Sequence, residues 1–368
     1  MSTFQLNIDC EGPLTQNDNA FELCEAFIPE GGEFFKRISR YDDYLVEVEK
    51  KPNYKAGDTL KLILPFLKAY GISSHDMREF SKKTLCLIPG TQELLKQLSN
   101  TIPSFIISTS YRPYLDALCE LTGFPKDNVY ATEVDIDLYD LPEEEQGILK
   151  DYIRKINSLK LIDWPEGSNS LSDLDDKSKE AVLLLDKIFW EELPNMESGR
   201  ILKDVNPIGG HEKARAVEHS LTRTKNSLSQ VIYIGDSITD SEALELVAKA
   251  GGVAIAFNAN RYAIKRANWS ITSGDTRIIG AIIELILNKG KEALFDLVGN
   301  HGHLAGDEFL SRLKDLNISL ELLDPLKGLS SILAPTITSI SSTNITQLIE
   351  HSEKVRKAVR GVAVGTLG

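Results

Sequence analysis

Four short apolar runs, each ending in small or polar residues, constrain the fold of this chain more than any other feature. They span residues 4–9, 104–108, 231–236 and 253–257. Helical patterns lie between them, such as residues 91–98, where leucines recur on one face and Thr91 is a candidate cap. Strands that alternate with helices predict parallel pairing and a doubly wound α/β sheet. In such a sheet, reactive side chains gather beyond the carboxyl ends of the strands.

Two long segments interrupt this alternation. Residues 17–87 carry helical patterns, and residues 134–204 are richer in charge. Because 368 residues are many for a single core, we expect insertions into one main domain. The predicted catalytic core comprises residues 1–16, 88–133 and 205–275, and a helical C-terminal extension follows at 276–368. Within this extension, residues 336–346 are rich in Ser and Thr and are predicted to form a linker.

The formal net charge of −13 excludes broad classes of partner. Nucleic acids and anionic membranes require a basic surface, so neither is expected. No apolar run is long enough to cross a bilayer, and the first residues form a strand pattern rather than a signal peptide. The four cysteines show neither metal-ligand nor disulfide-rich spacing, which favours buried free thiols and a cytoplasmic location.

The first predicted strand ends in a pair of acidic residues. Asp9 and Glu11 point the same way if the strand persists, and Gly12 then lets the chain turn sharply. One carboxylate can attack a substrate while the other moves protons. The alternative is an ordinary strand end with exposed acids.

A later apolar strand leads directly into Gly235-Asp236, and a second aspartate, Asp240, follows four residues after the first. Magnesium prefers a few carboxylate oxygens together with water and phosphate oxygens, so this spacing suits a hard-cation site. Asp240 can equally cap a helix or lie in its first turn, where the helix dipole favours an acid. The two roles are compatible.

In their order along the chain, these motifs resemble those of the haloacid dehalogenase (HAD) superfamily. The order is Asp9-x-Glu11-Gly12, then Ser108 at a strand end, then Lys213, then Gly235-Asp236-x-x-x-Asp240. Residues 106–112 are similar to the second motif of phosphoserine phosphatase-like members, and residues 209–214 are similar to their lysine motif. The arrangement of two insertions resembles that of poorly characterised archaeal members. The resemblance implies a HAD-like Rossmannoid core with a helical cap at 17–87 and a second, mostly helical insertion at 134–204.

The resemblance also implies a role for each matching residue. Asp9 is expected to attack phosphorus and form an aspartyl-phosphate. Glu11 is expected to protonate the leaving oxygen and then to activate water. Ser108 and Lys213 are expected to hold the phosphoryl oxygens, with Thr109 as a further substrate-binding residue.

Magnesium is the implied cofactor. Its expected ligands are Asp9, the main-chain carbonyl of Glu11 and Asp236, with Asp240 as a further ligand or a support. Asp18 lies near the place of a cap-side glutamate that meets the substrate amine in phosphoserine phosphatases, so it is a candidate substrate-binding residue. A helix N-cap is the alternative role for Asp18.

Glu11 departs from the aspartate that most phosphatases of the superfamily carry. Its side chain is one methylene longer, and a misplacement of about 1 Å can cost roughly a hundredfold in rate. The enolase-phosphatase branch resembles this chain in carrying Glu at the position. Dehalogenases lack an acid there and transport ATPases carry Thr, so hydrolysis of a phosphate ester remains the expected reaction.

We therefore expect a HAD-type phosphatase, a magnesium-dependent hydrolase acting on a small phosphorylated metabolite. One alternative is a phosphotransferase or mutase that uses the same nucleophile. Another is a binding or assembly subunit with weak catalysis. A chemically competent group occupies every motif position, which favours the active enzyme. A homodimer is compatible with the sequence.

Overall fold

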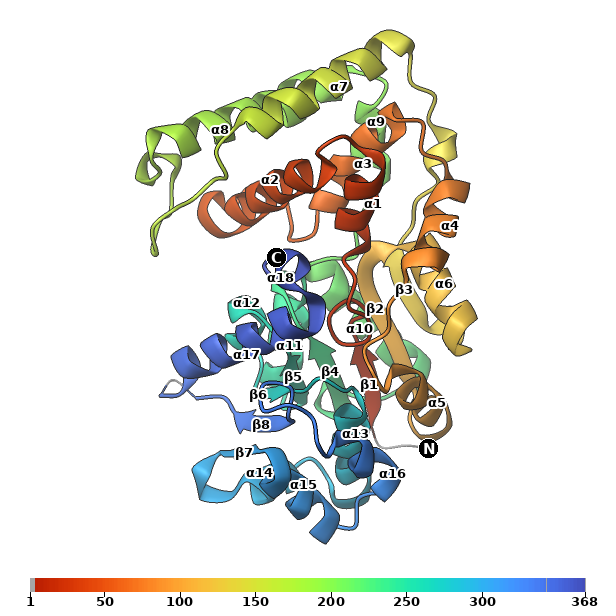
Figure 1. Cartoon of the computed structure of the whole chain (residues 1–368), viewed down its shortest axis with the longest axis vertical. Coiled ribbons are helices and arrows are strands. Elements are labelled where there is room, and N and C mark those ends of the chain that lie inside the picture. Colours follow the sequence, from red (N-terminus) through yellow and green to blue (C-terminus); the bar gives the residue numbers. More distant parts are fainter. Residues whose placement is uncertain (1–3, 342, 368) are drawn as a thin grey trace.

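One mixed sheet forms the centre of the molecule in the computed structural model, which describes residues 4–341 and 343–367 (Figure 1). In this part of the chain the strand order is β3-β2-β1-β4-β5-β6-β8-β7. The six strands from β3 to β6 in that order pair in parallel, whereas β8 and β7 pair antiparallel at one edge. The strands are β1 (Gln5–Ile8), β2 (Ser104–Tyr111), β3 (Val129–Thr132), β4 (Val231–Gly235), β5 (Val253–Phe257), β6 (Trp269–Thr272), β7 (His303–Ala305) and β8 (Thr336–Ser339). The predicted α/β fold is therefore confirmed.

Helices cover both faces of the sheet because alternate strand residues are apolar on each side. On one face, Ile8 and Ile234 pack against α5 (Thr91–Thr101), α6 (Arg112–Thr122) and α13 (Arg277–Lys289). On the other face, Tyr233 and Ala254 pack against α10 (His211–Thr224) and α11 (Ser241–Lys249). The four predicted strands correspond to β1, β2, β4 and β5. The sequence reading missed β3 and β6, which flank them.

The start of α5 differs from the prediction. Gly90, with φ 84°, is the N-cap, and Thr91 is the first helical residue. The Thr91 hydroxyl donates instead to the main-chain oxygen of Leu14 at 2.8 Å. The Thr91 hydroxyl, which the local pattern assigned to capping, thus binds a distant part of the chain instead.

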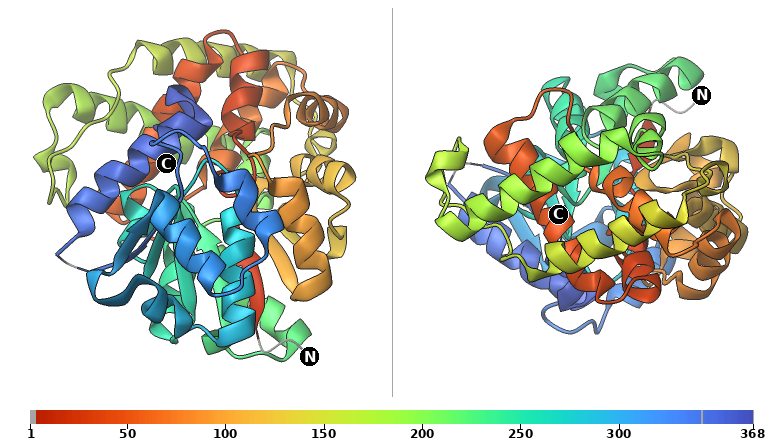
Figure 2. Two further views of the ribbon diagram at one scale, coloured as in Figure 1. Left: turned by 60° about the horizontal axis from the view of Figure 1, so that its bottom comes forward. Right: turned by 90° about the horizontal axis from the view of Figure 1, so that it is seen from above.

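The two insertions pack together into a single cap above the sheet (Figures 1 and 2). Both contribute to one hydrophobic cluster, in which Phe34 and Phe66 of the first insertion pack near Phe189 of the second. The first insertion contains α1 (Asn19–Phe27), α2 (Gly31–Tyr44), α3 (Thr59–Ala69) and α4 (Ser74–Thr84). The second contains α7 (Glu143–Ser158), α8 (Asp176–Asp186) and α9 (Gly199–Asp204). The first insertion lies next to the sheet, and the second supports it from outside.

The C-terminal extension is mostly helical, but it also completes the sheet. Its helices include α14 (Ala293–Val298), α15 (Gly306–Asp315), α17 (Ile345–Arg360) and α18 (Val362–Gly365). The predicted linker at 336–346 is wrong at its start, because residues 336–339 form β8 between β6 and β7. Thr and Ile alternate there, and Ile337 is buried, so β-branched side chains on a pleated strand explain the difference.

Two further expectations concern the cysteines and the membrane. Cys10, Cys24 and Cys119 are buried free thiols, as predicted, whereas Cys86 is exposed. Cys86 follows the end of α4, where the chain returns from the cap to the core. Within the described residues, no helix combines the length and the apolar character that a bilayer crossing requires.

Candidate active site

The strand register brings the predicted site residues to one edge of the sheet. Ile8 pairs with Ile106 on one side and with Ile234 on the other. Asp9 follows Ile8 directly, and Ser108 and Asp236 each lie two residues beyond their paired isoleucines. Because neighbouring parallel strands end together, side chains far apart in the sequence meet above β1.

Lys213 lies at the centre of this edge and is fully buried. Its ammonium group donates to Asp9 Oδ2 at 2.6 Å and to Asp240 Oδ1 at 2.7 Å. It occupies the first turn of α10, which begins after Gly210. Burial alone lowers the pKa of the Lys213 ammonium, but the Asp240 and Asp9 carboxylates together raise it above its usual value. Lys213 is therefore a fixed positive charge facing Asp9.

Burial acts on the Asp9 carboxyl in the opposite sense. It raises the pKa of Asp9 to about 8, and the Lys213 ammonium opposes the shift. The main-chain N–H of Cys10 also donates to Asp9 Oδ1 at 2.7 Å. Positive charge beside Asp9 is thus what favours the ionised form that a carboxylate nucleophile needs.

Asp240 has hydrogen-bond partners at both carboxylate oxygens. Oδ1 accepts from Lys213 and, at 2.8 Å, from the hydroxyl of Tyr233. Oδ2 accepts from the main-chain N–H of Asp236 at 3.0 Å and from that of Ser237 at 3.1 Å. Asp240 therefore fixes both the loop after β4 and the lysine.

The donor set suits a hard divalent cation. Carboxylate oxygens of Asp9, Asp236 and Asp240 lie within 4.8 Å of one another. Oxygen ligands of this kind are those that magnesium prefers. Asp9 and Asp236 line the cavity, whereas Asp240 binds Lys213, Tyr233 and two main-chain N–H groups behind it, so Asp9 and Asp236 are the better placed ligands.

Gly12 is needed for the close approach of the first motif to Asp236. Its φ of 101° lies in the region that side chains disfavour. A Cβ at this position would also overlap the Asp236 carboxylate. The glycine that follows the acidic pair is thus explained by both backbone conformation and space.

Glu11 and Asp18 lie on the side of the site that faces the cap. Glu11 Oε1 accepts from the main-chain N–H of Asn19 at 2.7 Å. Burial, followed by the nearby Asp18 carboxylate, raises the pKa of Glu11 well above its usual value and so favours its protonated form. Asp18 is the N-cap of α1, where its Oδ1 accepts from the main-chain N–H of Phe21 at 3.0 Å. The capping role predicted as the alternative for Asp18 is confirmed.

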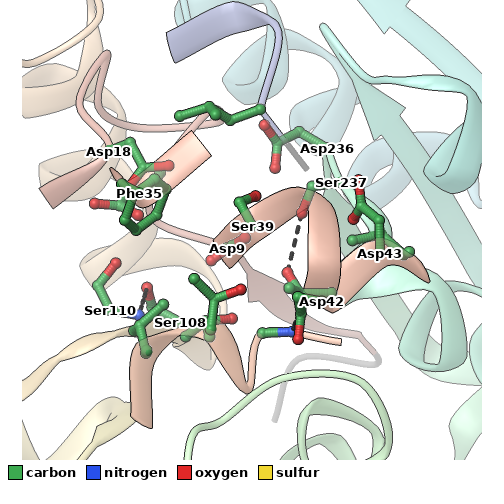
Figure 3. Close-up of a pocket in the computed structure, with 18 of the residues that line it drawn as sticks. Asp9, Asp18, Phe35, Ser39, Asp42, Asp43, Ser108, Ser110, Asp236 and Ser237 are labelled. Carbon is green, nitrogen blue, oxygen red and sulfur yellow. Dashed lines mark hydrogen bonds between the residues drawn. The ribbon is translucent and has the colours of Figure 1, made fainter. Parts of the chain in front are cut away.

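A small cavity of about 90 Å³ connects these groups (Figure 3). Asp9, Ser108 and Thr109 line it from the core, and Phe35 and Asp42 of α2 line it from the cap. The Thr109 hydroxyl is buried and has no hydrogen-bond partner among the described residues. An unpaired buried hydroxyl beside Asp9 is suited to a polar group of a ligand. The first insertion, not the second, therefore closes the site.

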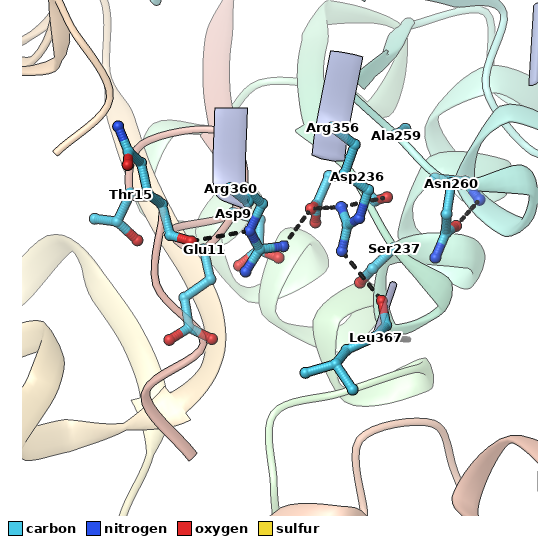
Figure 4. A network of polar contacts seen from close by, with 12 residues as sticks. Asp9, Glu11, Thr15, Asp236, Ser237, Ala259, Asn260, Arg356, Arg360 and Leu367 are labelled. Carbon is cyan, nitrogen blue, oxygen red and sulfur yellow. Dashed lines mark hydrogen bonds and ion pairs between the residues drawn. The ribbon is translucent and has the colours of Figure 1, made fainter. Parts of the chain in front are cut away.

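The sequence reading missed two arginines at this site. Arg356 and Arg360 come from α17, and both guanidinium groups pair with Asp236 Oδ2, Arg360 at 3.1 Å (Figure 4). The only local signal is their spacing of four residues in line with buried Ser352. Such a pattern is equally typical of a solvated basic face at a helix C-terminus, so it offers no reason to connect the two arginines with Asp236.

The fold and the strand-edge residues together agree with those expected for a hydrolase of the HAD type. The family of haloacid dehalogenase-like hydrolases matches residues 127–282, and this part of the chain, which includes Lys213, Asp236 and Asp240, is therefore similar to that family. A gene product of Archaeoglobus fulgidus has a similar structure, with a TM-score of 0.79 and 28% sequence identity over 99% of each chain. Both insertions and the C-terminal extension are thus within the shared length.

Other solved structures are less similar. A phosphoserine phosphatase in its apo form aligns with a TM-score of 0.45 and 14% identity over 75% of this chain and 96% of its own. A HAD family hydrolase from Salmonella enterica aligns with a TM-score of 0.43 and 11% identity over 72% of this chain and 66% of its own. No curated protein matches the sequence. The similarity to HAD-like hydrolases therefore rests on the family match, and the Archaeoglobus structure shows a similar fold over the length of the chain.

Proposed function

We propose that the protein is a magnesium-dependent phosphomonoester hydrolase that forms an aspartyl-phosphate on Asp9. The observation that carries the proposal is the buried Asp9–Lys213 pair, which lies 2.6 Å apart beside Asp236 at a cavity closed by the cap. A carboxylate nucleophile needs positive charge nearby, both to stay ionised and to approach a phosphate. Lys213 supplies that charge in a site sheltered from water.

In the first step, an Asp9 carboxylate oxygen attacks phosphorus while the bond from phosphorus to the leaving oxygen breaks. Glu11 gives its proton to the leaving oxygen, and the raised pKa of Glu11 suits this role. In the second step, Glu11 takes a proton from water, whose oxygen attacks phosphorus. The bond between phosphorus and Asp9 then breaks, so inorganic phosphate and the free carboxylate are formed.

Three residues of the core are suited to hold the phosphoryl oxygens. Lys213 offers a charged donor, and Ser108 and Thr109 offer hydroxyl groups at the cavity wall. Asp9, Asp236 and the main-chain carbonyl of Glu11 would hold magnesium, which would neutralise charge on the phosphoryl group when bound. Asp240 acts as a positioning residue through its contacts with Lys213 and the loop after β4.

The size of the cavity limits the substrate. About 90 Å³ leaves room for a phosphoryl group and a small leaving group, which points to a small phosphorylated metabolite. The test is a screen of phosphorylated metabolites for release of inorganic phosphate, with magnesium and with a chelator. Phosphate release that requires magnesium supports the proposal. Transfer to an added alcohol without phosphate release would indicate a phosphotransferase instead.

Replacing Glu11 by Gln should lower the hydrolysis rate by about 10² to 10⁴ because it removes the proton donor while keeping the shape of the side chain. The effect should be smaller for substrates with an acidic leaving group, such as a nitrophenyl ester, because these need less help from a proton. The measurement is kcat for a matched pair of esters. Equal losses for both esters would argue against the acid role.

Asp18→Ser separates the two roles considered for Asp18. Serine is also a good N-cap, so the thermal midpoint should change little. Loss of the carboxylate at the cavity should lower kcat/KM for amine-bearing phosphate esters relative to esters of simple alcohols. An unchanged substrate profile would leave Asp18 with the capping role alone.

A further inference from the structure

The C-terminal segment connects the core of the molecule with the cap directly beside the site (Figures 1 and 2). Leu348 of α17 belongs to the hydrophobic cluster on one face of the sheet, and Val364 of α18 belongs to the cluster of the cap. Between them, the Ser352 hydroxyl donates to the main-chain oxygen of Ala259 at 2.7 Å. This contact sets the register of α17, so that the next two turns of the same face carry Arg356 and Arg360.

Both arginine side chains are buried, and their contacts converge on Asp236. Arg356 is 2% exposed and pairs with Asp236 Oδ2, and it also donates to the main-chain oxygen of Leu367 at 3.3 Å. Arg360 donates to Asp236 Oδ2 at 3.1 Å and to the main-chain oxygen of Gln16 at 3.2 Å (Figure 4). Arg356 Nε is buried without a partner among the described residues. Buried polar groups usually have hydrogen-bond partners, so this guanidinium is only partly compensated for its burial.

Three carboxylates and three cations therefore contact one another at the site. Lys213 pairs with Asp9 and Asp240, and Arg356 and Arg360 pair with Asp236. Within these six directly paired side chains, the charges balance without a metal ion, and the Asp18 carboxylate lies nearby. A divalent cation alone would add two positive charges to this buried place, whereas a divalent cation together with a phosphate dianion would add no net charge.

We propose that Arg356 and Arg360 compete electrostatically with magnesium at Asp236, an inference that rests on the proposed function. Magnesium alone then binds weakly, and magnesium and the phosphoryl group bind strongly together. The C-terminal helix thereby couples occupation of the metal site to the presence of substrate. By reciprocity, magnesium strengthens phosphate binding by the same factor.

The test is magnesium binding to the full chain in the absence of turnover, measured by calorimetry and by the rise of the thermal midpoint. Arg356→Gln removes one of the two positive charges beside Asp236. Arg360→Gln removes the other and provides an independent test if the first variant does not fold. Each should bind magnesium at least about tenfold more tightly than the parent without phosphate, because one repelling charge is gone. Arg356→Lys keeps the charge and should resemble the parent. Lys354→Gln removes an exposed charge from the same helix and should have no effect.

The parent protein provides a second measurement that needs no variant. Inorganic phosphate should strengthen its magnesium binding by at least about tenfold, and this factor should shrink in Arg356→Gln. Unchanged or weaker magnesium binding in both Gln variants would overturn the inference. So would micromolar magnesium binding to the parent without phosphate. In these cases magnesium-dependent phosphate release would still support the proposed function, whereas absence of magnesium binding under all conditions would overturn both.

Discussion

Asp9→Asn should lower the rate of phosphate release by a factor on the order of 10⁴ or more, because the amide cannot serve as the nucleophile. The substitution preserves the size of the side chain, and its single carbonyl oxygen can still accept a hydrogen bond either from Lys213 or from the N–H of Cys10. Any remaining activity would come from the positive groups around the phosphoryl site. The measurement is the initial rate on the best substrate of the metabolite screen, with magnesium.

Detection of the intermediate makes the same prediction more specific. Mass spectrometry of acid-quenched parent protein should find a phosphoryl group on the peptide that contains Asp9, and the variant should lack it. Asp43→Asn is the matched control, since Asp43 lines the same cavity from α2 and makes no contact with Lys213. A phosphoryl group on another residue, or an Asp9→Asn protein with the parent rate, would contradict the assignment of the nucleophile.

Lys213→Met should reduce both activity and stability. The rate should fall by about 10² to 10³, as for the loss of one charged group that stabilises the transition state. Stability should fall by about 3–5 kcal/mol, because Asp9 and Asp240 remain in a buried place without their shared counter-charge. The measurements are kcat and the free energy of unfolding in urea at a fixed pH.

The control for Lys213→Met is the same substitution at a lysine that also pairs with an aspartate but is exposed. Lys160 pairs with Asp175 at 2.8 Å on the surface, and Lys160→Met should leave the free energy of unfolding nearly unchanged. A Lys213→Met protein as stable as Lys160→Met would show that the buried pair contributes little. A stable Lys213→Met protein with the parent rate would remove Lys213 from the phosphoryl site.

Much of the core was predictable because its signals are local. The apolar runs that became β1, β2, β4 and β5 each need burial on both faces, which leaves a parallel sheet as the favourable arrangement. Because strands alternate with helices along the chain, the carboxyl ends of the parallel strands lie at one edge of the sheet. Asp9, Ser108 and Asp236 could therefore be assigned to one site without coordinates. The capping role considered for Asp18 is also a local signal, whereas the contacts of Lys213 with Asp9 and Asp240 were not predicted.

Other features could not be inferred from local patterns. The segment that forms β8 was predicted to be a linker because Ser and Thr are common in linkers and Thr is also common in strands. Only the pairing of this segment with β6 and β7 distinguishes a strand from a linker here. The union of the two insertions depends on apolar side chains such as Phe66 and Phe189, which lie more than a hundred residues apart. Asp240 could be a ligand or a cap in the sequence, and its hydrogen bonds to the loop after β4 favour the second role.

The sequence by itself predicted the α/β fold, the resemblance to the HAD superfamily, the strand edge that carries the site, and the acid, lysine and aspartate groups that gather there. These follow from residue types at short spacings, where a few bonds fix the geometry. Only the tertiary structure decided which insertion closes the cavity and that Arg356 and Arg360 reach Asp236 from the other end of the chain. The packing of segments far apart in the sequence sets the closure of the cavity and the position of the two arginines, since the position of a buried charge depends on the side chains that pack around it.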